Sequence, residues 1–168
     1  MKLNIRKVAV AGMMTAVGVA LSGFYIPIGV SKCFPIQHLL NVLAGVFLGP
    51  SYALGFAFCT AFIRNMIGTG SLLAFPGSMV GAFCCGMAYK YLKKIPFAVI
   101  GEVLGTGVIG GMLCFPVAKF LLGNAQAALF TYVIPFTVST VGGSAIAAVL
   151  LLVLYQSKAF AYMNRLLE

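Results

Sequence analysis

Long apolar runs separated by short basic clusters are the feature that most restricts how this chain folds. A membrane helix needs roughly 20 apolar residues to cross about 30 Å of hydrocarbon. Only 8% of the residues are charged, whereas soluble domains carry about 25%, so the chain could not cover a water-facing surface. We therefore predict a single transmembrane domain over residues 1–168, an all-α multi-pass protein of the cell membrane. Its six predicted spans cover about residues 5–25, 36–48, 51–66, 72–91, 96–122 and 125–155.

Two of these runs, 36–48 and 51–66, are shorter than a bilayer crossing requires. Either each thins the bilayer locally or is sheltered by its neighbours, or the two form one re-entrant hairpin. Both alternatives leave the two chain termini on the same side of the membrane. The first run extends beyond the usual core of a signal peptide, so we interpret it as a retained span.

The distribution of Lys and Arg predicts which side that is. Loops on the cytoplasmic side carry an excess of basic residues, and six crossings divide the basic residues eight to three in favour of the side with both termini. We therefore expect cytoplasmic termini. The cytoplasmic set is Lys2, Arg6, Lys7, Lys90, Lys93, Lys94, Lys158 and Arg165, and the outer set is Lys32, Arg64 and Lys119.

The sequence lacks the motifs of the common catalytic and nucleic-acid-binding classes. It has no GxxxxGK[ST] nucleotide loop, no GxSxG elbow and no HExxH helix. Its five cysteines and single histidine have no zinc-type spacing. The net charge of +9 comes without a basic stripe interleaved with aromatic residues. We predict no enzymatic activity, no catalytic residues, no metal or cofactor, and no nucleic-acid partner.

Polar residues interrupt the apolar pattern near the predicted outer helix ends. Gln37 and Asn41 share one helix face at a spacing of four residues, with His38 beside them. These groups either contact a ligand, or His38 is a hydrogen-bonded packing residue. Arg64 and Ser78 flank a glycine- and hydroxyl-rich stretch that could wrap a small polar molecule. Alternatively, Arg64 extends to the membrane interface, as basic residues near helix ends commonly do.

Glu102 is an ionisable residue within the predicted span 96–122. Such a residue is costly in a membrane and suggests function by default. It lies about 9 Å from the cytoplasmic start of its helix, at 1.5 Å per residue. We expect it to hydrogen-bond between helices or to face a cytoplasmic partner, with direct ligand contact as the remaining alternative.

Aromatic rings and small residues complete the set of candidates. Rings from Phe75, Phe115, Tyr132 and Phe136, with Asn124 in the last outer turn, could form an apolar pocket with a few polar anchors. Small residues recur every four positions, which lets helices approach closely. We interpret the pairs Gly77/Gly81, Gly101/Gly105 and Gly107/Gly111 as internal packing seams, and keep Gly12, Ala16 and Ala20 apart as a separate stripe.

Four blocks of the sequence resemble the ThiW family. This family comprises substrate-binding (S) components of energy-coupling-factor (ECF) vitamin transporters. The blocks and their spacing extend over nearly the whole chain. They are KCFPIQHLLNVLAGVFLGP (32–50), RNMIGTGSLLAFPGSMVGA (64–82), GEVLGTGVIGG (101–111) and PFTVSTVGGS (135–144).

The resemblance implies a six-helix S-component fold and a non-enzymatic function. Such a subunit binds its cargo at the outer side and topples on a module of one transmembrane scaffold and two ATPase subunits. The implied cargo is hydroxyethylthiazole, the thiazole precursor of thiamine. The implied pocket residues are Gln37, His38, Asn41, Phe75, Ser78 and Asn124, to which the residue patterns add Arg64 and Phe136.

The resemblance also implies a docking surface on the first helix. S components dock on the scaffold through an AxxxA pattern, which Ala16 and Ala20 match and Gly12 extends by a turn. Two alternatives stay open. The basic residues on the outer side leave room for a phosphorylated thiazole as cargo. A self-sufficient secondary transporter would usually show two related halves and ion-coupled intramembrane charges, of which only Glu102 is present.

Overall fold

The computed structural model describes residues 4–28 and 31–167, and the fold is helical as predicted. Lys2 lies outside the described residues. A short antiparallel hairpin, β1 (Ile26–Ile28) and β2 (Ser31–Cys33), was not expected and pairs Ile26 with Cys33. The described helices are α1 (Ile5–Ala20), α2 (Pro35–Phe47), α3 (Pro50–Met66), α4 (Ala74–Leu92), a continuous helix from Ile95 to Leu121, α7 (Val133–Gln156) and α8 (Ala159–Leu167).

The continuous helix changes its winding along its length. It comprises α5 (Ile95–Glu102), a π-helical segment (Val103–Gly110), α6 (Gly111–Pro116) and a second π-helical segment (Val117–Leu121). Among the described residues, this helix, Ile5–Gly23 and Val133–Gln156 are the three segments long and apolar enough to cross a membrane.

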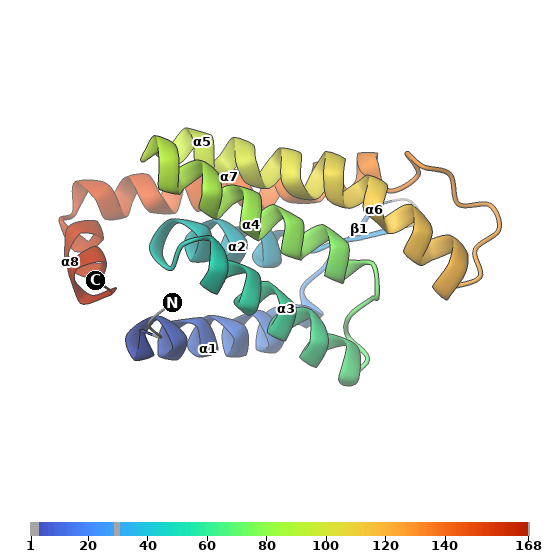
Figure 1. Cartoon of the computed structure of the whole chain (residues 1–168), viewed down its shortest axis with the longest axis horizontal. Coiled ribbons are helices and arrows are strands. Elements are labelled where there is room, and N and C mark those ends of the chain that lie inside the picture. Colours follow the sequence, from blue (N-terminus) through green and yellow to red (C-terminus); the bar gives the residue numbers. More distant parts are fainter. Residues whose placement is uncertain (1–3, 29–30, 168) are drawn as a thin grey trace.

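Both chain termini lie at the same end of the molecule (Figure 1). We call this the termini end. The opposite end, which we call the loop end, holds the hairpin, the α3–α4 connection and residues 122–132 (Figure 1). Helices α2, α4 and α7 begin at the loop end, while α1, α3 and the continuous helix finish there. Both helix beginnings and helix ends therefore lie at the loop end.

Helix α2 forms the centre of the bundle. It contacts α1, α3, α4, α5, α7 and α8, and nine of its thirteen residues are buried. A helix that is apolar on nearly all sides is stable only when it is covered on nearly all sides. Its neighbours therefore shelter this short helix, and its first turn carries Gln37 and His38 into the interior at the loop end.

Glycines allow the helices around α2 to approach closely, as the sequence predicted. A Cβ added to Gly105 would lie 2.9 Å from the Gly81 Cα, and one added to Gly110 would lie 2.7 Å from the Gly77 Cα. A Cβ on Gly107 would lie 2.6 Å from Thr137 Oγ1 of α7. These glycines join α4, the continuous helix and α7 by near backbone contact, which places Glu102 and Thr106 directly against α4.

Several element boundaries differ from the predictions. The last long helix begins at Val133 rather than near residue 125, because the apolar residues before it form turns. Helix α1 ends at Ala20, followed by a 3-10 turn (Leu21–Gly23) rather than helix up to residue 25. Hydropathy alone does not separate apolar turns from helix.

The short helix α8 was also not predicted. Its Phe160 ring lies 5.2 Å from the Phe47 ring, measured between ring centroids. The carbonyl of Leu167 accepts a hydrogen bond from Asn4 Nδ2 at 3.0 Å. Asn4 also caps α1, since its Oδ1 accepts from the backbone N–H groups of Arg6 and Lys7. Helix α8 therefore closes the termini end of the bundle.

Candidate functional site

A cavity of about 350 Å³ opens at the loop end. It is bounded by the first turns of α2, α4 and α7, the end of α3, the loop after α3 and the middle of the continuous helix. The described residues that line it include no Asp or Glu. They are Phe34, Gln37, His38, Arg64, Gly68, Thr69, Gly70, Ser71, Leu73, Ala74, Ser78, Thr106, Tyr132, Phe136 and Ser139.

Arg64 is buried in the wall of this cavity, with 3% of its surface exposed. Its guanidinium lies 4.2 Å from the centroid of the Phe34 ring, a cation–π contact. Nη1 donates to Gln37 Oε1 at 3.2 Å, and Nη2 donates to the Thr69 carbonyl at 3.3 Å. The Arg64 side chain therefore turns into the protein instead of extending to the membrane interface, which was the alternative interpretation.

The loop after α3 positions both the arginine and its carbonyl partner. The N–H groups of Thr69 and Gly70 donate to the Arg64 carbonyl at 2.9 and 2.8 Å, with Gly68 at a positive φ of 76°. Glycine readily adopts that conformation after a helix C-terminus. A Cβ on Gly70 would lie 2.8 Å from the Asn65 nitrogen, so the loop can fold back only with glycine there. The Gly68-Thr69-Gly70 sequence thus ends α3 and shapes the cavity wall.

A directed chain of hydrogen bonds leads from Arg64 into the core. Gln37 accepts from Arg64 and donates through Nε2 to Asn41 Oδ1 at 3.2 Å and to Ser78 Oγ at 3.1 Å. Asn41 Nδ2 then donates to Glu102 Oε1 at 2.9 Å. Every amide in the chain is oriented with its oxygen toward Arg64 and its nitrogen toward Glu102. The network therefore separates a cation at the cavity from a carboxylate behind it.

Glu102 is fully buried, and it links the continuous helix to α2. Its Oε1 accepts from Asn41, from Thr106 Oγ1 at 3.0 Å, and from His38 Nδ1 at 3.0 Å when that nitrogen carries a proton. His38 and Thr106 line the cavity, whereas Glu102 does not. The interhelical hydrogen bonding that the sequence left as one alternative is confirmed. Glu102 holds cavity residues from one layer behind them.

Three helices begin at the cavity without a side-chain cap. The N-cap residues of α2, α4 and α7 are Phe34, Leu73 and Tyr132, and none of them makes a capping hydrogen bond. All three line the cavity. The first backbone N–H groups of a helix lack partners within the helix and carry its positive dipole end. The cavity is thus surrounded by partial positive charge in addition to Arg64.

Comparison with known protein families shows to which family the chain belongs. A family model described as thiamine-precursor transporter protein (ThiW) matches residues 8–157. The chain belongs to the ThiW family. Comparison with curated proteins and with solved structures gave no significant match. The match confirms the resemblance and the prediction of a transport protein rather than an enzyme. Together with three long apolar helices, it points to a membrane location.

The cavity of this ThiW-family chain gathers most of the residues selected from the sequence. Gln37, His38, Arg64, Ser78 and Phe136 line it. Asn41 lies one layer behind, where it is fully buried and bonded to both Gln37 and Glu102.

Two selected residues lie apart from the lining of this cavity. The Phe75 ring lies against Phe58, 5.8 Å away between centroids. Asn124 is exposed and donates to the Tyr132 hydroxyl at 3.4 Å.

Phe34 was seen only as a member of a polar stretch. It stacks on Arg64, and its N–H donates to Ser139 Oγ of α7 at 3.0 Å. Its sequence signal was proximity to Pro35, which does not specify a cross-helix contact. Tyr132, which was expected among the pocket rings, lines the cavity 6.3 Å from Phe136, measured between ring centroids. A Cβ on Gly77 would lie 2.6 Å from the Phe136 ring, so that glycine leaves space for the ring.

The small-residue stripe of α1 faces away from the bundle. Gly12, Ala16 and Ala20 are exposed, and nothing in the described structure lies within 4 Å of a Cβ added to Gly12. The opposite face of α1 packs inward through Gly18, where an added Cβ would lie 3.1 Å from Thr60. The stripe therefore takes no part in the packing of this chain.

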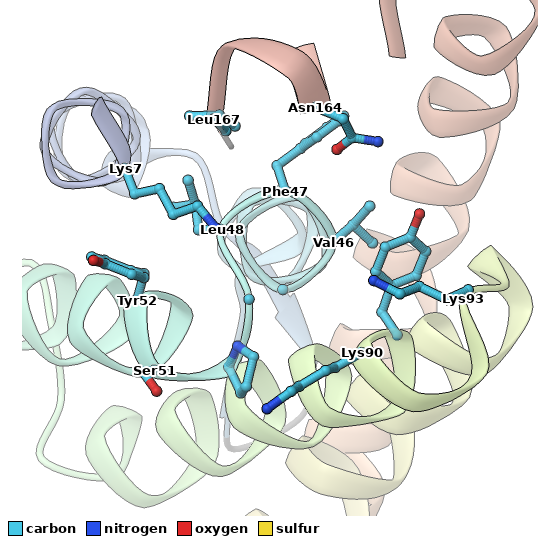
Figure 2. Close-up of a pocket in the computed structure, with 14 residues that line it drawn as sticks. Lys7, Val46, Phe47, Leu48, Ser51, Tyr52, Lys90, Lys93, Asn164 and Leu167 are labelled. Atoms are coloured by element: carbon cyan, nitrogen blue, oxygen red, sulfur yellow. The ribbon is translucent and has the colours of Figure 1, made fainter. Parts of the chain in front are cut away.

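A second cavity of about 440 Å³ lies at the termini end. Figure 2 shows Lys7, Lys90 and Lys93 approaching the turn between α2 and α3 from different sides. The Lys7 and Lys93 ammonium groups lie over the rings of Tyr52 and Tyr89, each 5.8 Å from the ring centroid. Lys90 and Lys93 are exposed, and α8 contributes Asn164 and Leu167 to the same wall.

Proposed function

We propose that this chain is the substrate-binding S component of an ECF importer for the thiamine precursor hydroxyethylthiazole. The observation that carries the proposal is the loop-end cavity, which combines aromatic rings with a fixed set of hydrogen-bonding groups. Small-molecule sites are mainly apolar cavities of about 300–1,000 Å³ with a few oriented polar groups. The volume of about 350 Å³ is at the lower end of that range, as suits a single small ring.

The rings and polar groups suit a thiazole alcohol. Phe34, Tyr132 and Phe136 offer faces on which a flat heteroaromatic ring can stack. Gln37, His38 and Ser78 offer donors and acceptors for the ring nitrogen and the hydroxyl group. Most of these groups are held by the network behind them, so the site needs little rearrangement to bind.

We further propose six membrane spans with both termini in the cytoplasm, which makes the loop end the outer end. Lys7, Lys90 and Lys93 lie together at the termini end, in keeping with the excess of basic residues on cytoplasmic sides. The cavity then faces the source of the nutrient. Labelling single cysteines introduced at Lys93 and at Asn124 with a membrane-impermeant reagent in intact cells tests the orientation. Only the Asn124 position should react.

Energy for transport would come from partner subunits. The chain has no nucleotide-binding loop of the GxxxxGK[ST] type, and the exposed stripe of Gly12, Ala16 and Ala20 offers a smooth face on which another helix can pack. We propose that this face docks on the ECF transmembrane scaffold subunit, which two ATPase subunits drive. Co-purification with these subunits, and uptake that stops on ATP depletion, are the expected results.

The Ala16→Trp substitution separates docking from binding. A tryptophan on the stripe should abolish uptake by cells, while the purified variant still binds hydroxyethylthiazole. The matched control is Ala145→Trp, which places the same side chain on an exposed position of α7. Loss of binding along with uptake would make the stripe part of the binding fold, and normal uptake would exclude it from docking.

One observation favours a second candidate function. The buried pair of His38 and Glu102, 3.0 Å apart, could couple transport to protons in a self-sufficient secondary carrier. Reconstituting the chain alone in vesicles distinguishes the two functions. An S component should bind hydroxyethylthiazole without concentrating it, whereas a carrier should accumulate it when a proton gradient is imposed.

A further inference from the structure

The loop-end cavity contains a buried cation that has no carboxylate beside it. Arg64 is the only Lys or Arg among the described residues that line the cavity, and no Asp or Glu lines it. Its hydrogen-bonding partners are a neutral amide oxygen and a backbone carbonyl. A buried charge is normally paired with an opposite charge. The usual partner is missing from the wall that Arg64 forms.

Glu102 does not supply that partner. Two amide side chains, Gln37 and Asn41, separate it from Arg64 along the hydrogen-bond chain. Its Oε1 is already bonded to Asn41 and Thr106 and lies 3.0 Å from His38 Nδ1. This chain of hydrogen bonds runs in one direction. Its positive end, Arg64, therefore lies at the cavity, and its negative end, Glu102, lies in the core.

The guanidinium also retains unused donor capacity. Arg64 Nε is buried and has no hydrogen-bond partner in the described structure. A buried N–H that belongs to a charged group is costly to leave unpaired. A ligand oxygen that carried negative charge would satisfy it.

The helix beginnings point to the same chemistry independently. Helices α2, α4 and α7 begin at the cavity with the apolar N-cap residues Phe34, Leu73 and Tyr132, and none makes a side-chain cap. Side-chain caps are also missing where α3 and α5 begin at the termini end, so the loop end differs in having three helix beginnings at one cavity. At α4, the N–H groups of Ala74 and Phe75 already donate to the Ser71 and Leu72 carbonyls. Helix N-termini favour anions through the positive ends of their dipoles. Transporters use the same device to hold anionic substrates.

We propose that the loop-end cavity selects an anionic ligand, namely the phosphate ester of hydroxyethylthiazole, over the neutral alcohol and over the cationic thiazolium of intact thiamine. This inference rests on the proposed function for the identity of the ring. Phe34 both stacks on Arg64 and lines the cavity. A ring packed on the aromatic wall would therefore keep its side-chain phosphate within the region of Arg64 and the helix beginnings.

The first test uses the unmodified protein. Purified protein in detergent is titrated at pH 7.5 with hydroxyethylthiazole, its phosphate ester and thiamine, with inorganic phosphate as a competitor. The phosphate ester should bind about tenfold or more tightly than the alcohol, which is the scale of one charge-assisted hydrogen bond. Thiamine should bind more weakly than the alcohol, and added salt should reduce the preference for the ester.

Substitution of Arg64 then tests whether this residue causes the preference for the phosphate ester. Arg64→Gln should remove the preference for the ester, so that the ratio of the affinities for ester and alcohol falls to about one, and Arg64→Lys should keep part of the preference. The matched control is Lys119→Gln, which removes an equal charge that lies over the Phe115 ring, outside the residues lining the cavity. Thermal unfolding of each variant shows whether it is folded.

The outcomes separate this inference from the proposed function. Equal affinity of the unmodified protein for alcohol and ester would overturn the anion selection and leave thiazole binding intact. A preference that survives Arg64→Gln in a folded variant would overturn the role of Arg64. If neither thiazole binds but inorganic phosphate does, the anion selection stands and the proposed cargo fails. Binding of none of these probes overturns both.

Discussion

The two ends of the molecule both carry basic side chains around a cavity, yet they hold them in opposite ways. At the loop end, Arg64 is 3% exposed, makes two hydrogen bonds and stacks on an aromatic ring. At the termini end, Lys90 and Lys93 (Figure 2) are exposed. Their ammonium groups lie over the rings of Tyr91 and Tyr89. The termini-end cavity is the larger of the two, about 440 Å³ compared with about 350 Å³.

The difference supports our proposal that the loop end is the binding site, because its arginine is desolvated and held in a fixed geometry, although the termini end has more charges and the larger cavity. A water-exposed lysine is screened and flexible, so it contributes little to specificity. The lysines at the termini end also surround the last turn of α2 (Figure 2), where cations stabilise the negative end of a helix dipole. A buried arginine among helix beginnings remains uncompensated until a ligand arrives.

Glu102→Ala should produce the largest effect, because it removes the anchor of the loop-end network. The acceptor shared by Asn41, Thr106 and His38 would disappear, leaving buried donors without partners. We expect the free energy of unfolding to fall by about 3 kcal/mol and ligand binding to be lost. Thermal unfolding in detergent and ligand titration measure the two effects.

The isosteric control for this substitution is Glu102→Gln. It keeps an acceptor oxygen in place, so it should cost less stability than Glu102→Ala and retain weakened binding. If Glu102→Ala left both stability and binding intact, the fixed geometry of the loop end would not depend on the buried carboxylate, and the contrast with the termini end would lose its basis.

Gly81→Ala should have the next largest effect, since it disturbs the same network sterically. The added Cβ would overlap Thr106 Oγ1 and would lie 2.7 Å from Glu102 Oε2. Overpacking of this kind costs about 1–3 kcal/mol, so we expect unfolding at lower temperature and at least tenfold weaker ligand binding. The measurement again combines thermal unfolding with titration.

Gly142→Ala provides the matched control for Gly81→Ala. Nothing in the described structure lies within 4 Å of a Cβ at Gly142, which is exposed on α7. Alanine there should leave binding unchanged and stabilise the helix by about 0.5–1 kcal/mol. Equal behaviour of the two variants would mean that α4 and the continuous helix are not as closely packed at Gly81 as the structure has them.

The sequence predicted much of the loop end because polar residues are conspicuous in an apolar chain. Gln37, His38, Arg64 and Ser78 were selected on this basis and all line the cavity. The glycine seams were predictable for a similar reason, since a spacing of four residues places small groups on one helix face. Both patterns, polar residues in an apolar run and glycines four residues apart, can be recognised within a single helix.

Contacts between helices were not predictable to the same degree. No local pattern indicates which of the 14 phenylalanines face the cavity, so Phe75 was selected and Phe34 was not. The link from Arg64 to Glu102 passes through two amides on α2, and depends on how α2, α3 and the continuous helix pack. The late start of α7 was missed because apolar turns have the hydropathy of a membrane helix. The β1–β2 hairpin lies between two predicted spans, and its three-residue strands are too short to show an alternating pattern.

The smallest effect is expected from the termini-end lysines. Their substitution tests whether the termini end contributes to ligand binding. Replacing Lys7, Lys90 and Lys93 together by Gln removes three positive charges around the larger cavity. Lys90 and Lys93 are exposed and Lys7 is half-buried. Charges at the protein surface are worth roughly 0–1 kcal/mol each. Affinity for the thiazole ligands should therefore change less than twofold, with only a small change in the unfolding temperature.

The same titrations that measure Arg64→Gln measure this triple variant, so the two ends can be compared on one scale. Loss of the single buried charge at the loop end should exceed the combined effect of the three lysines at the termini end, because only the arginine is fully buried, at low dielectric and in a fixed position. If the triple variant weakened binding of the phosphate ester as much as Arg64→Gln does, the termini-end cavity would have to contribute to binding of the ester. The assignment of the site to the loop end would then be wrong, since no lining residue is shared by the two cavities.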